Sequence, residues 1–476
     1  MKKYHIKSEG TKRIEHDLLG DKEVPAEALY GVQTLRCIEN FDISRQLLSD
    51  YPQFIKAFGM VKMAAVLANH RLGLIDTSLK DAIVAACQEL IDGKHTEQFP
   101  VDMIQGGAGT SMNMNANEVI ANRALEIMGK EKGDYQYCHP NDHVNMAQST
   151  NDAYPTAMHL GLYMVHLDVK AALEQLIDSF AVKETEFAKV IKMGRTQLQD
   201  AVPMTLGQSF GAFASAMRHE LKHLENAAKE LLIINMGATA IGTGITAEPG
   251  YAEACTQFLK EISGWKIKLA DNLIEATHDT SPMVSYSSAL KMIAIRLSKI
   301  CNDLRLMSSG PRTGLAEINL PPKQPGSSIM PGKVNPVIPE VVNQVCFRVI
   351  GNDLTITMAS EAAQLELNVM EPVLVHSLVE SSLWLKRAFD TLRVECIDGI
   401  TANADHCRYL VEHSVGIVTA LKPFIGYANS TEIAKEALES GCSVYQLVLD
   451  KQLLTKEQLD KILDPANMIR PVKITL

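Results

Sequence analysis

Residues Thr156–Lys192, TAMHLGLYMVHLDVKAALEQLIDSFAVKETEFAKVIK, form the longest helical pattern in the chain. Apolar residues recur here at the three- and four-residue spacing of one face of an α-helix. That face is wide and comprises Met158, Leu160, Leu162, Met164, Val165, Leu167, Val169, Leu173, Leu176 and Ile177. At a rise of about 1.5 Å per residue, such a helix spans roughly 40 Å or more.

Four further segments carry comparable patterns, namely Thr205–Asn235, Met283–Ser308, Val337–Ala363 and Val373–Ile400. Helices of this length pack side by side, so the sequence predicts a mainly α fold built on a long-helix bundle. Five helices alone would not cover so much apolar surface, and we therefore expect self-association. A coiled coil is the alternative for such lengths, but the apolar stripe is not a clean heptad and Gly207, Gly211 and Gly351 interrupt it.

Shorter elements are expected before the bundle. Residues 1–50 are expected to be extended and irregular, with short strand or turn pieces near Val24-Pro25 and Tyr30-Gly31. Apolar spacing predicts two amphipathic helices within Pro52–Gly93. A third helix is expected to end near Met128, with Ser111 or Asn113 as its N-cap.

The chain changes to shorter helices after about Thr401. Thr455 with Gln458 has the spacing of a capping box, which predicts a helix start there. We divide the chain into an N-terminal, mostly helical domain (1–150), a central long-helix domain (151–405) and a small helical C-terminal domain (406–476).

Composition excludes several classes of protein. The formal net charge of -10 and the lack of a Lys/Arg cluster with interleaved aromatics argue against nucleic-acid binding. No apolar run approaches the length of a membrane span, and the first residues lack the apolar stretch of a signal peptide, so we expect a cytoplasmic protein. The nine scattered cysteines are typical of reduced, mostly buried thiols. His139 and His143 have helical metal-ligand spacing, but Pro140 lies between them and no metal site is expected.

Four polar blocks lie at predicted helix ends or in loops: Gly106–Asn117, Gln148–Asp152, Gly194–Asp200 and Gly326–Pro336. The last block, GSSIMPGKVNP, combines hydroxyls, one ammonium and one amide, and its glycines and prolines favour a loop that closes over an anion. Each block alone is explained by helix capping or by exposure to water. Together they supply neutral donors and one cation, a set suited to a small dicarboxylate. By contrast, Met236–Tyr251 has no GxxxxGK[ST] pattern, so no nucleotide site is expected there.

Such a set of donors suits removal of a proton from the carbon next to a carboxylate. The product of that step is an aci-carboxylate, whose extra negative charge preorganised donors stabilise as it develops. A serine can serve as the base only if neighbouring backbone N–H groups and a cation such as Lys333 lower its pKa.

Several motifs resemble the aspartase/fumarase superfamily, and its aspartase branch in particular, over nearly the whole chain. They are VPAEALYGVQTLRCIENF (Val24–Phe41), QGGAGTSMNMNANEV, PNDHVNMAQSTNDAYPT, KMGRTQLQDAVPMTLGQ, GSSIMPGKVNP and NVMEPV. The resemblance implies a three-domain chain, a homotetramer with a twenty-helix core, and active sites shared by three subunits. It implies release of ammonia from L-aspartate to give fumarate, with no organic cofactor, and leaves activation by Mg²⁺ open.

The resemblance also implies a role for each residue of the motifs. Ser327 is expected to be the catalytic base that removes the Cβ proton. The substrate's β-carboxylate is expected to bind four hydroxyl side chains: Thr110, Ser149, Thr150 and Ser328. The α-carboxylate is expected to bind Thr196, Lys333 and Asn335, and the departing amino group to lie near Asn151.

Gln197 departs from the family pattern, because fumarases and some aspartases have histidine at this place. Glutamine cannot accept a proton, so Ser327 is left nearly alone as base, and Glu340 is expected to be either a buried acid or an acid just behind the residues that bind the substrate. This difference favours ammonia over water as the leaving group. His139 matches a histidine of an accessory carboxylate site in fumarases, but Gln136 stands in place of that site's usual arginine, so we expect this accessory site to be weak or missing. Fumarate hydratase and a non-catalytic relative remain the alternatives.

Overall fold

The computed structural model describes residues 10–469, 471 and 473, so most of the N-terminal segment considered for a signal peptide lies outside the described residues. The chain divides into two compact units. The first unit comprises Met1–Lys170, Lys222–Met292 and Arg348–Leu385, and the second comprises Ala171–Leu221, Ile293–Phe347 and Lys386–Leu476. The division into three domains stays a prediction.

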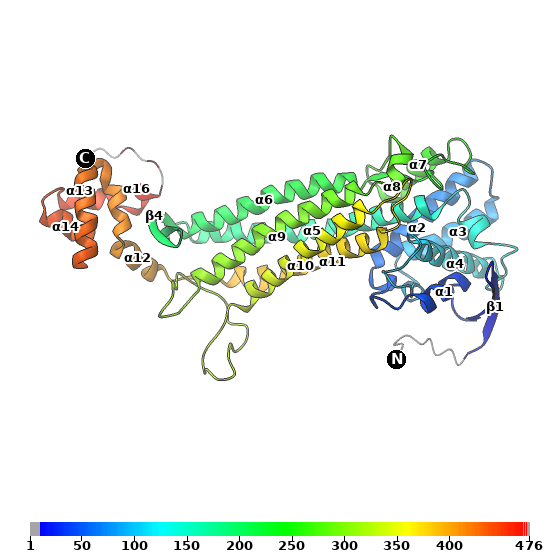
Figure 1. The fold of residues 1–476 in the computed structure, drawn as a ribbon, viewed down its shortest axis with the longest axis horizontal. Helices are drawn as coiled ribbons and strands as arrows, with labels where there is room; N and C mark the ends of the chain where they lie inside the picture. Colours follow the sequence, from blue (N-terminus) through cyan, green and yellow to red (C-terminus); the bar gives the residue numbers. More distant parts are fainter. Residues whose placement is uncertain (1–9, 470, 472, 474–476) are drawn as a thin grey trace. The chain divides into compact units, whose positions relative to one another are not determined.

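All five long segments predicted from the sequence are helices, which confirms the mainly α fold (Figure 1). They are α5 (Thr150–Glu186), α6 (Leu206–Glu230), α9 (Ser281–Met307), α10 (Val337–Glu361) and α11 (Glu371–Glu395). Each of these helices contributes residues to both units.

Helix α5 begins six residues before the predicted start, because Pro155 does not end it. Proline has no N–H to donate to the carbonyl four residues earlier, which here belongs to Asn151. The side-chain amide of Asn235 donates to that carbonyl instead, at 2.9 Å. The helix can therefore include Pro155 without leaving a buried acceptor unpaired.

Among its described residues, the first unit holds two pairs of short strands and six further helices. The strands are β1 (Lys12–Asp17), β2 (Gly20–Pro25), β5 (Ile233–Ile234) and β6 (Lys268–Leu269), paired β1–β2 antiparallel and β5–β6 parallel. The helices are α1 (Val32–Asn40), α2 (Pro52–Arg71), α3 (Thr77–Ile91), α4 (Thr110–Ile127), α7 (Tyr251–Ser263) and α8 (Leu273–His278). Single turns occur at Leu48–Asp50, Thr96–Gln98 and Pro140–Val144. The prediction of two helices within Pro52–Gly93 is confirmed, whereas α1 and the extent of the β1–β2 hairpin were not predicted.

Buried side chains hold the first unit together. Phe54 and Phe58 of α2 are fully buried, and a Cβ at Gly161 of α5 would lie 2.3 Å from the Phe54 ring. The close approach of α2 and α5 therefore requires glycine at this position. Polar contacts also link the long helices, as where Lys291 of α9 pairs with Asp353 of α10 at 2.6 Å.

The second unit combines an antiparallel hairpin with the C-terminal helices. Its strands are β3 (Ile191–Thr196), β4 (Gln199–Thr205), β7 (Ile318–Asn319) and β8 (Thr401–Ala402). Its shorter helices are α12 (Ala404–His413), α13 (Val418–Ser440), α14 (Val444–Asp450), α15 (Lys456–Ile462) and α16 (Pro465–Met468), with single turns at Ile397–Gly399 and Val415–Ile417. The predicted continuation of the first long helix to Lys192 is wrong, because Ile191 and Met193 pack in a strand against C-terminal residues such as Leu421 and Val448.

The predicted capping box is confirmed, since Thr455 and Gln458 exchange side-chain and backbone hydrogen bonds at the start of α15. The cysteines are free, and all except Cys442 are buried, as predicted. Among the described residues, no helix combines the length and the apolar character needed to cross a membrane.

Candidate active site

Two helix N-termini meet in the first unit. Helix α4 begins at Thr110 and α5 at Thr150, and the Asn113 amide donates to Oγ1 of Thr150 at 3.2 Å. The first turns of both helices carry N–H groups without helical partners and the positive end of the helix dipole. The residues around this junction are therefore placed in a region that favours an anion.

The turn before α4 depends on Gly109. Its φ is +86°, a left-handed conformation, and a Cβ on it would lie 2.5 Å from Cδ2 and Cγ of Tyr154 in α5. Gly107 and Ala108 also have positive φ. This turn leaves Thr110 exposed, with its hydroxyl donating to the Gly107 carbonyl at 2.7 Å. The prediction that Ser111 or Asn113 caps α4 is wrong, because both lie inside the helix and Gly109 occupies the N-cap position.

Asp152 fixes the start of α5. Its buried carboxylate accepts from the backbone N–H groups of Ser149 (2.9 Å), Gly237 (3.1 Å) and Thr239 (2.9 Å). Burial raises the pKa of Asp152 to about 6, although these three donors favour the ionised form. The amide of Asn151 donates to the Ala240 carbonyl at 2.8 Å. The Gly/Thr-rich connection predicted not to bind nucleotide thus anchors the segment that carries Ser149, Thr150 and Asn151.

Thr196 and Gln197 lie at the β3–β4 turn of the second unit. Gln197 and Leu198 have φ values of +52° and +62°, as in a type I′ hairpin turn, although neither is glycine or asparagine. Strain of this kind persists only where surrounding contacts determine the backbone. Arg195 supplies one such contact, because it pairs at 2.5 Å with the fully buried Glu317.

Glu317 also pairs with Lys192, at 2.7 Å, so this carboxylate holds two cations of the hairpin. Both cations have little exposure to solvent, with side chains 9% (Lys192) and 14% (Arg195) exposed. Because Glu317 precedes the Gly326–Pro336 loop in the chain, the ion pairs tie the hairpin to the segment that leads into the loop.

The Gly326–Pro336 loop is closed at its base. The Gly326 N–H donates to the Lys333 carbonyl at 2.6 Å, and the Asn335 amide donates to the Gly326 carbonyl at 2.9 Å. Above this base, Oγ of Ser327 accepts from the backbone N–H groups of Ile329 (3.1 Å) and Met330 (3.0 Å). Two fixed donors on this oxygen favour a negative charge there.

The ten residues predicted for the site fall into two sets. The first unit brings together Thr110, Ser149, Thr150 and Asn151 at the two helix N-termini, whereas the second unit holds Thr196 and Gln197 at the hairpin turn and Ser327, Ser328, Lys333 and Asn335 in the loop. Ser328 and Lys333 are exposed. Glu340 is partly exposed in the first turn of α10, so the alternative of a buried acid is wrong, and a place just behind the substrate-binding residues stays a prediction.

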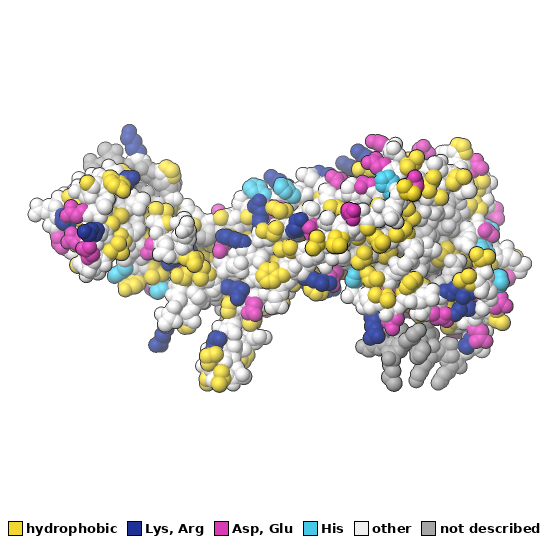
Figure 2. All heavy atoms as spheres, in the orientation of Figure 1, with side chains coloured by type: hydrophobic (Ala, Val, Ile, Leu, Met, Phe, Trp, Pro, Cys, Tyr) yellow, Lys and Arg dark blue, Asp and Glu magenta, His cyan; other side chains and the backbone are white. Residues whose placement is uncertain are grey.

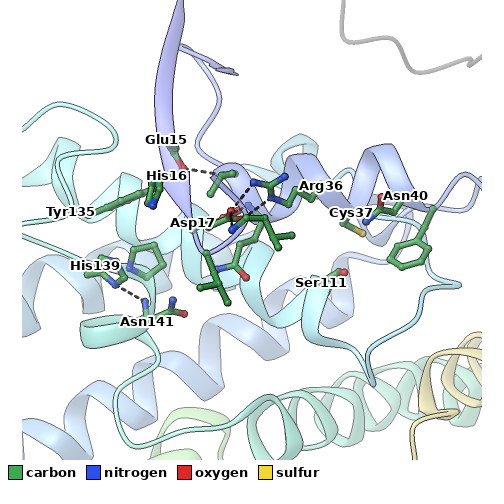
Figure 3. A pocket seen from close by; sticks show the side chains of 17 residues that line it. Glu15, His16, Asp17, Arg36, Cys37, Asn40, Ser111, Tyr135, His139 and Asn141 are labelled. Atoms are coloured by element: carbon green, nitrogen blue, oxygen red, sulfur yellow. Dashed lines mark hydrogen bonds and ion pairs between the residues drawn. The ribbon is translucent and has the colours of Figure 1, made fainter. Parts of the chain in front are cut away.

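A cavity of about 620 Å³ lies elsewhere in the first unit, and none of the ten residues lines it (Figure 3). Arg36 points to Asp17 in this cavity and forms two hydrogen bonds with its carboxylate. His139 accepts the backbone N–H groups of Asn141 and Asp142 with Nδ1, so its ring caps the 140–144 turn. Gln136 donates to Asp134 at 2.7 Å, and that the accessory carboxylate site is weak or missing stays a prediction. Across residues 10–469, no group of three or more His, Cys, Asp or Glu side chains could hold a metal ion.

Sequence reasoning missed Lys62, which is fully buried beside the first set. Its ammonium donates to the side-chain oxygens of Asn113 (2.7 Å), Asn145 (3.0 Å) and Gln148 (2.8 Å). The available signal was a lysine on the apolar face of a helix, next to Val61 and one turn after Phe58. That pattern indicates a buried charge but does not reveal its partners.

Comparison with known proteins shows the family of the chain. Residues 20–351 match the family described as Lyase, and residues 417–470 match the family described as Fumarase C C-terminus. The chain belongs to the Lyase family, within the aspartase/fumarase superfamily.

Individual relatives are similar over nearly their whole length. The aspartate ammonia-lyase of Pseudomonas aeruginosa is 60% identical and that of Helicobacter pylori 58%, with 98% and 96% of this chain and 98% of each relative covered. A solved structure of fumarate lyase:delta crystallin from Brucella melitensis is 54% identical with a TM-score of 0.95, covering 97% of this chain and all of that one. The fold predicted from the motifs is therefore confirmed.

Proposed function

We propose that the chain is an aspartate ammonia-lyase, which converts L-aspartate reversibly to fumarate and ammonia. Relatives of that name are 60% and 58% identical over nearly the whole chain. Every position carried over from the family motifs is a residue type that can perform its expected role. Intact donor positions also argue against a non-catalytic relative.

Ser327 carries most weight in this proposal, because the reaction needs a base for a weakly acidic C–H group. The N–H groups of Ile329 and Met330 point to the Ser327 oxygen and would stabilise its alkoxide. The alkoxide takes the Cβ proton of L-aspartate and becomes a hydroxyl. The electron pair of the broken C–H bond moves into the β-carboxylate, which becomes an aci-carboxylate.

The hydroxyls of Thr110, Ser149, Thr150 and Ser328 bind the β-carboxylate in this scheme. The two helix N-termini that carry the first three favour the second negative charge as it develops. When the aci-carboxylate collapses, its electron pair forms the Cα–Cβ double bond and the Cα–N bond breaks. Ammonia leaves, and fumarate remains.

The α-carboxylate binds Lys333, Thr196 and Asn335, and the departing amine lies next to Asn151. Gln197 contacts the substrate from the strained β3–β4 turn. Because glutamine cannot take up a proton, the site lacks a second base for the activation of water, which favours ammonia as the leaving group over the hydratase reaction. A side-chain base with backbone and side-chain donors suffices for these steps, so the scheme requires no cofactor.

We further propose a cytoplasmic homotetramer in which three subunits complete each site. The two sets of site residues belong to different units of the chain. Helix α10 carries an apolar face with Phe347 62%, Leu354 63% and Met358 64% exposed, and hydrophobic side chains are visible along the surface of the long helices (Figure 2). Such a face suits the same helices of another copy.

Fumarate absorbance tests the reaction directly. The purified chain should form fumarate from L-aspartate and none from L-malate; fumarate from malate alone would identify a hydratase instead. Ser327→Ala should abolish turnover, whereas Ser328→Ala, which removes a neighbouring donor but not the base, should reduce kcat by about 100-fold. Equal losses in the two variants would remove Ser327 as base.

Two measurements test the assembly. Light scattering should give a mass four times that of the 52.3 kDa chain. Mixed tetramers of inactive Ser327→Ala chains and impaired but measurably active Thr150→Val chains should be more active than either variant alone, because some sites then receive both native residues. A monomeric mass, or no recovery in verified mixed tetramers, would contradict shared sites.

A further inference from the structure

Lys62 of α2 is a buried cation beside the two helix N-termini, and its ammonium donates three hydrogen bonds to three side-chain amide oxygens. The acceptors belong to Asn113, Asn145 and Gln148, at 2.7 to 3.0 Å. Burial lowers the pKa of Lys62 to about 7, but three donated bonds use all three protons of the ammonium form. This geometry therefore belongs to charged Lys62.

A lysine ammonium can only donate, so each amide must turn its oxygen toward Lys62 and its nitrogen away. The Gln148 nitrogen then donates to the carbonyls of Val144 (3.0 Å) and Met146 (3.2 Å). The Asn145 nitrogen donates to the Gln148 carbonyl at 3.3 Å. One charge thus fixes the orientation of two amides, and these hold the turn that leads into Ser149.

The third amide reaches the proposed carboxylate site. With its oxygen on Lys62, Asn113 presents its nitrogen to Oγ1 of Thr150, and donates at 3.2 Å. A hydroxyl that accepts from an amide keeps its own proton to donate to another group. Thr150 can then donate to a bound carboxylate, whereas a reversed Asn113 amide would draw the hydroxyl proton to itself.

We propose that Lys62 is a positioning residue for the carboxylate site, which sets the Asn113 amide so that the Thr150 hydroxyl donates to the substrate. This inference rests on the proposed lyase function and adds to it a residue that does not touch the substrate. The charge of Lys62 would act on substrate binding and turnover through two intermediate side chains.

Asn113→Asp is the sharpest test, because it keeps the shape of the side chain and an oxygen for Lys62 but removes the donor to Thr150. The same nitrogen also donates to Oδ1 of Asn145 at 3.2 Å, and this bond is lost as well. Asn145→Asp is the matched control: it puts the same new charge on the same ammonium, but the nitrogen it removes serves the Gln148 carbonyl. We expect kcat/KM for L-aspartate to fall about 100-fold in Asn113→Asp and no more than about 10-fold in Asn145→Asp. Equal losses would overturn the inference.

A double-variant experiment separates positioning from a general structural role. The background for this experiment is a Thr150→Val chain, in which the Thr150 hydroxyl is absent. If Asn113 acts through Thr150, adding Asn113→Asp to this background should lower kcat/KM no more than adding Asn145→Asp does. If the loss of kcat/KM in the Asn113→Asp/Thr150→Val double variant equals the product of the losses in the two single variants, action through Thr150 is contradicted. Lys62→Met should lower kcat/KM in the native background and much less in the Thr150→Val background. Should Lys62→Met fail to fold, the Asn113 comparison still decides, since those variants keep Lys62.

Binding of succinate, a non-reacting dicarboxylate, is measured in parallel by calorimetry with the same variants. If the native chain binds succinate but makes no fumarate from L-aspartate, the lyase proposal fails. The positioning inference is then tested by succinate affinity alone, which should be lower in Asn113→Asp than in Asn145→Asp. If the native chain neither binds succinate nor reacts, both are overturned.

Discussion

Gly109 offers a quantitative test of the turn that presents Thr110. Its φ of +86° is left-handed, and an alanine Cβ would lie 2.5 Å from two ring atoms of Tyr154, a fully buried side chain. Gly107 is a matched control, because its φ of +95° is also unfavourable for alanine but the nearest atoms to its Cβ, those of Thr110, lie 3.8 Å away.

The two contributions can be estimated separately. A non-glycine residue in the left-handed region costs about 1 to 2 kcal/mol, which both variants should lose. Displacing the Tyr154 ring adds an overpacking cost of about 1 to 3 kcal/mol, which only Gly109→Ala should lose. Unfolding in urea should therefore show Gly107→Ala destabilised by about 1 to 2 kcal/mol and Gly109→Ala by about 2 to 5 kcal/mol.

Activity should separate the variants as well. If the Tyr154 ring moves the first turn of α4 by about 1 Å, Thr110 is misplaced relative to Thr150, and fumarate formation should fall about 100-fold in Gly109→Ala. Equal destabilisation of the two variants would refute the steric argument. Normal turnover in a clearly destabilised Gly109→Ala chain would refute the link between this turn and the site.

Three further predictions concern charged groups. Lys333→Ala should raise KM for L-aspartate by about 10- to 100-fold with a smaller change in kcat, as steady-state kinetics would show. Glu317→Leu should lower stability by about 3 to 5 kcal/mol in urea unfolding, since it leaves buried Lys192 without its carboxylate and partly buried Arg195 with only the more distant Asp200, at 3.8 Å. Changing both cations to methionine should restore most of the loss. Burial raises the pKa of Glu371 to about 8, whereas the carboxyl ionises near 4.5 in the unfolded chain. As the pH rises from 4.5 to 8, the free energy of unfolding should therefore fall by up to about 1.4 kcal/mol per pH unit. A Glu371→Gln chain with the same pH slope would exclude this cause.

The long helices could be predicted from the sequence because an apolar face repeated over 25 or more residues has few other interpretations. Their ends could not, since they depend on distant partners. The predicted late start of α5 placed too much weight on Pro155, whose missing hydrogen bond is replaced through Asn235. Helix α1 was missed because carboxylates from elsewhere in the chain, Glu15 and Glu118, accept the N–H groups of its first turn.

Site residues were predictable by type, but their surroundings were not. The motif around Ser327 identified a serine, yet its two donors are backbone groups whose direction depends on the loop conformation. Lys62 lies about fifty to ninety positions from its three partners, as the separations of 51, 83 and 86 residues show. No local pattern can reveal contacts over such separations.

The contacts of Asp152 have a consequence for protein engineering. The Met236–Tyr251 connection resembles a free linker in composition, but Gly237 and Thr239 donate to Asp152 and the Ala240 carbonyl accepts from Asn151. Added residues in this first half would disturb the start of α5. The second half, 246–249, is largely exposed and lies beyond these anchors, so a tag or a small domain inserted there should leave catalysis intact.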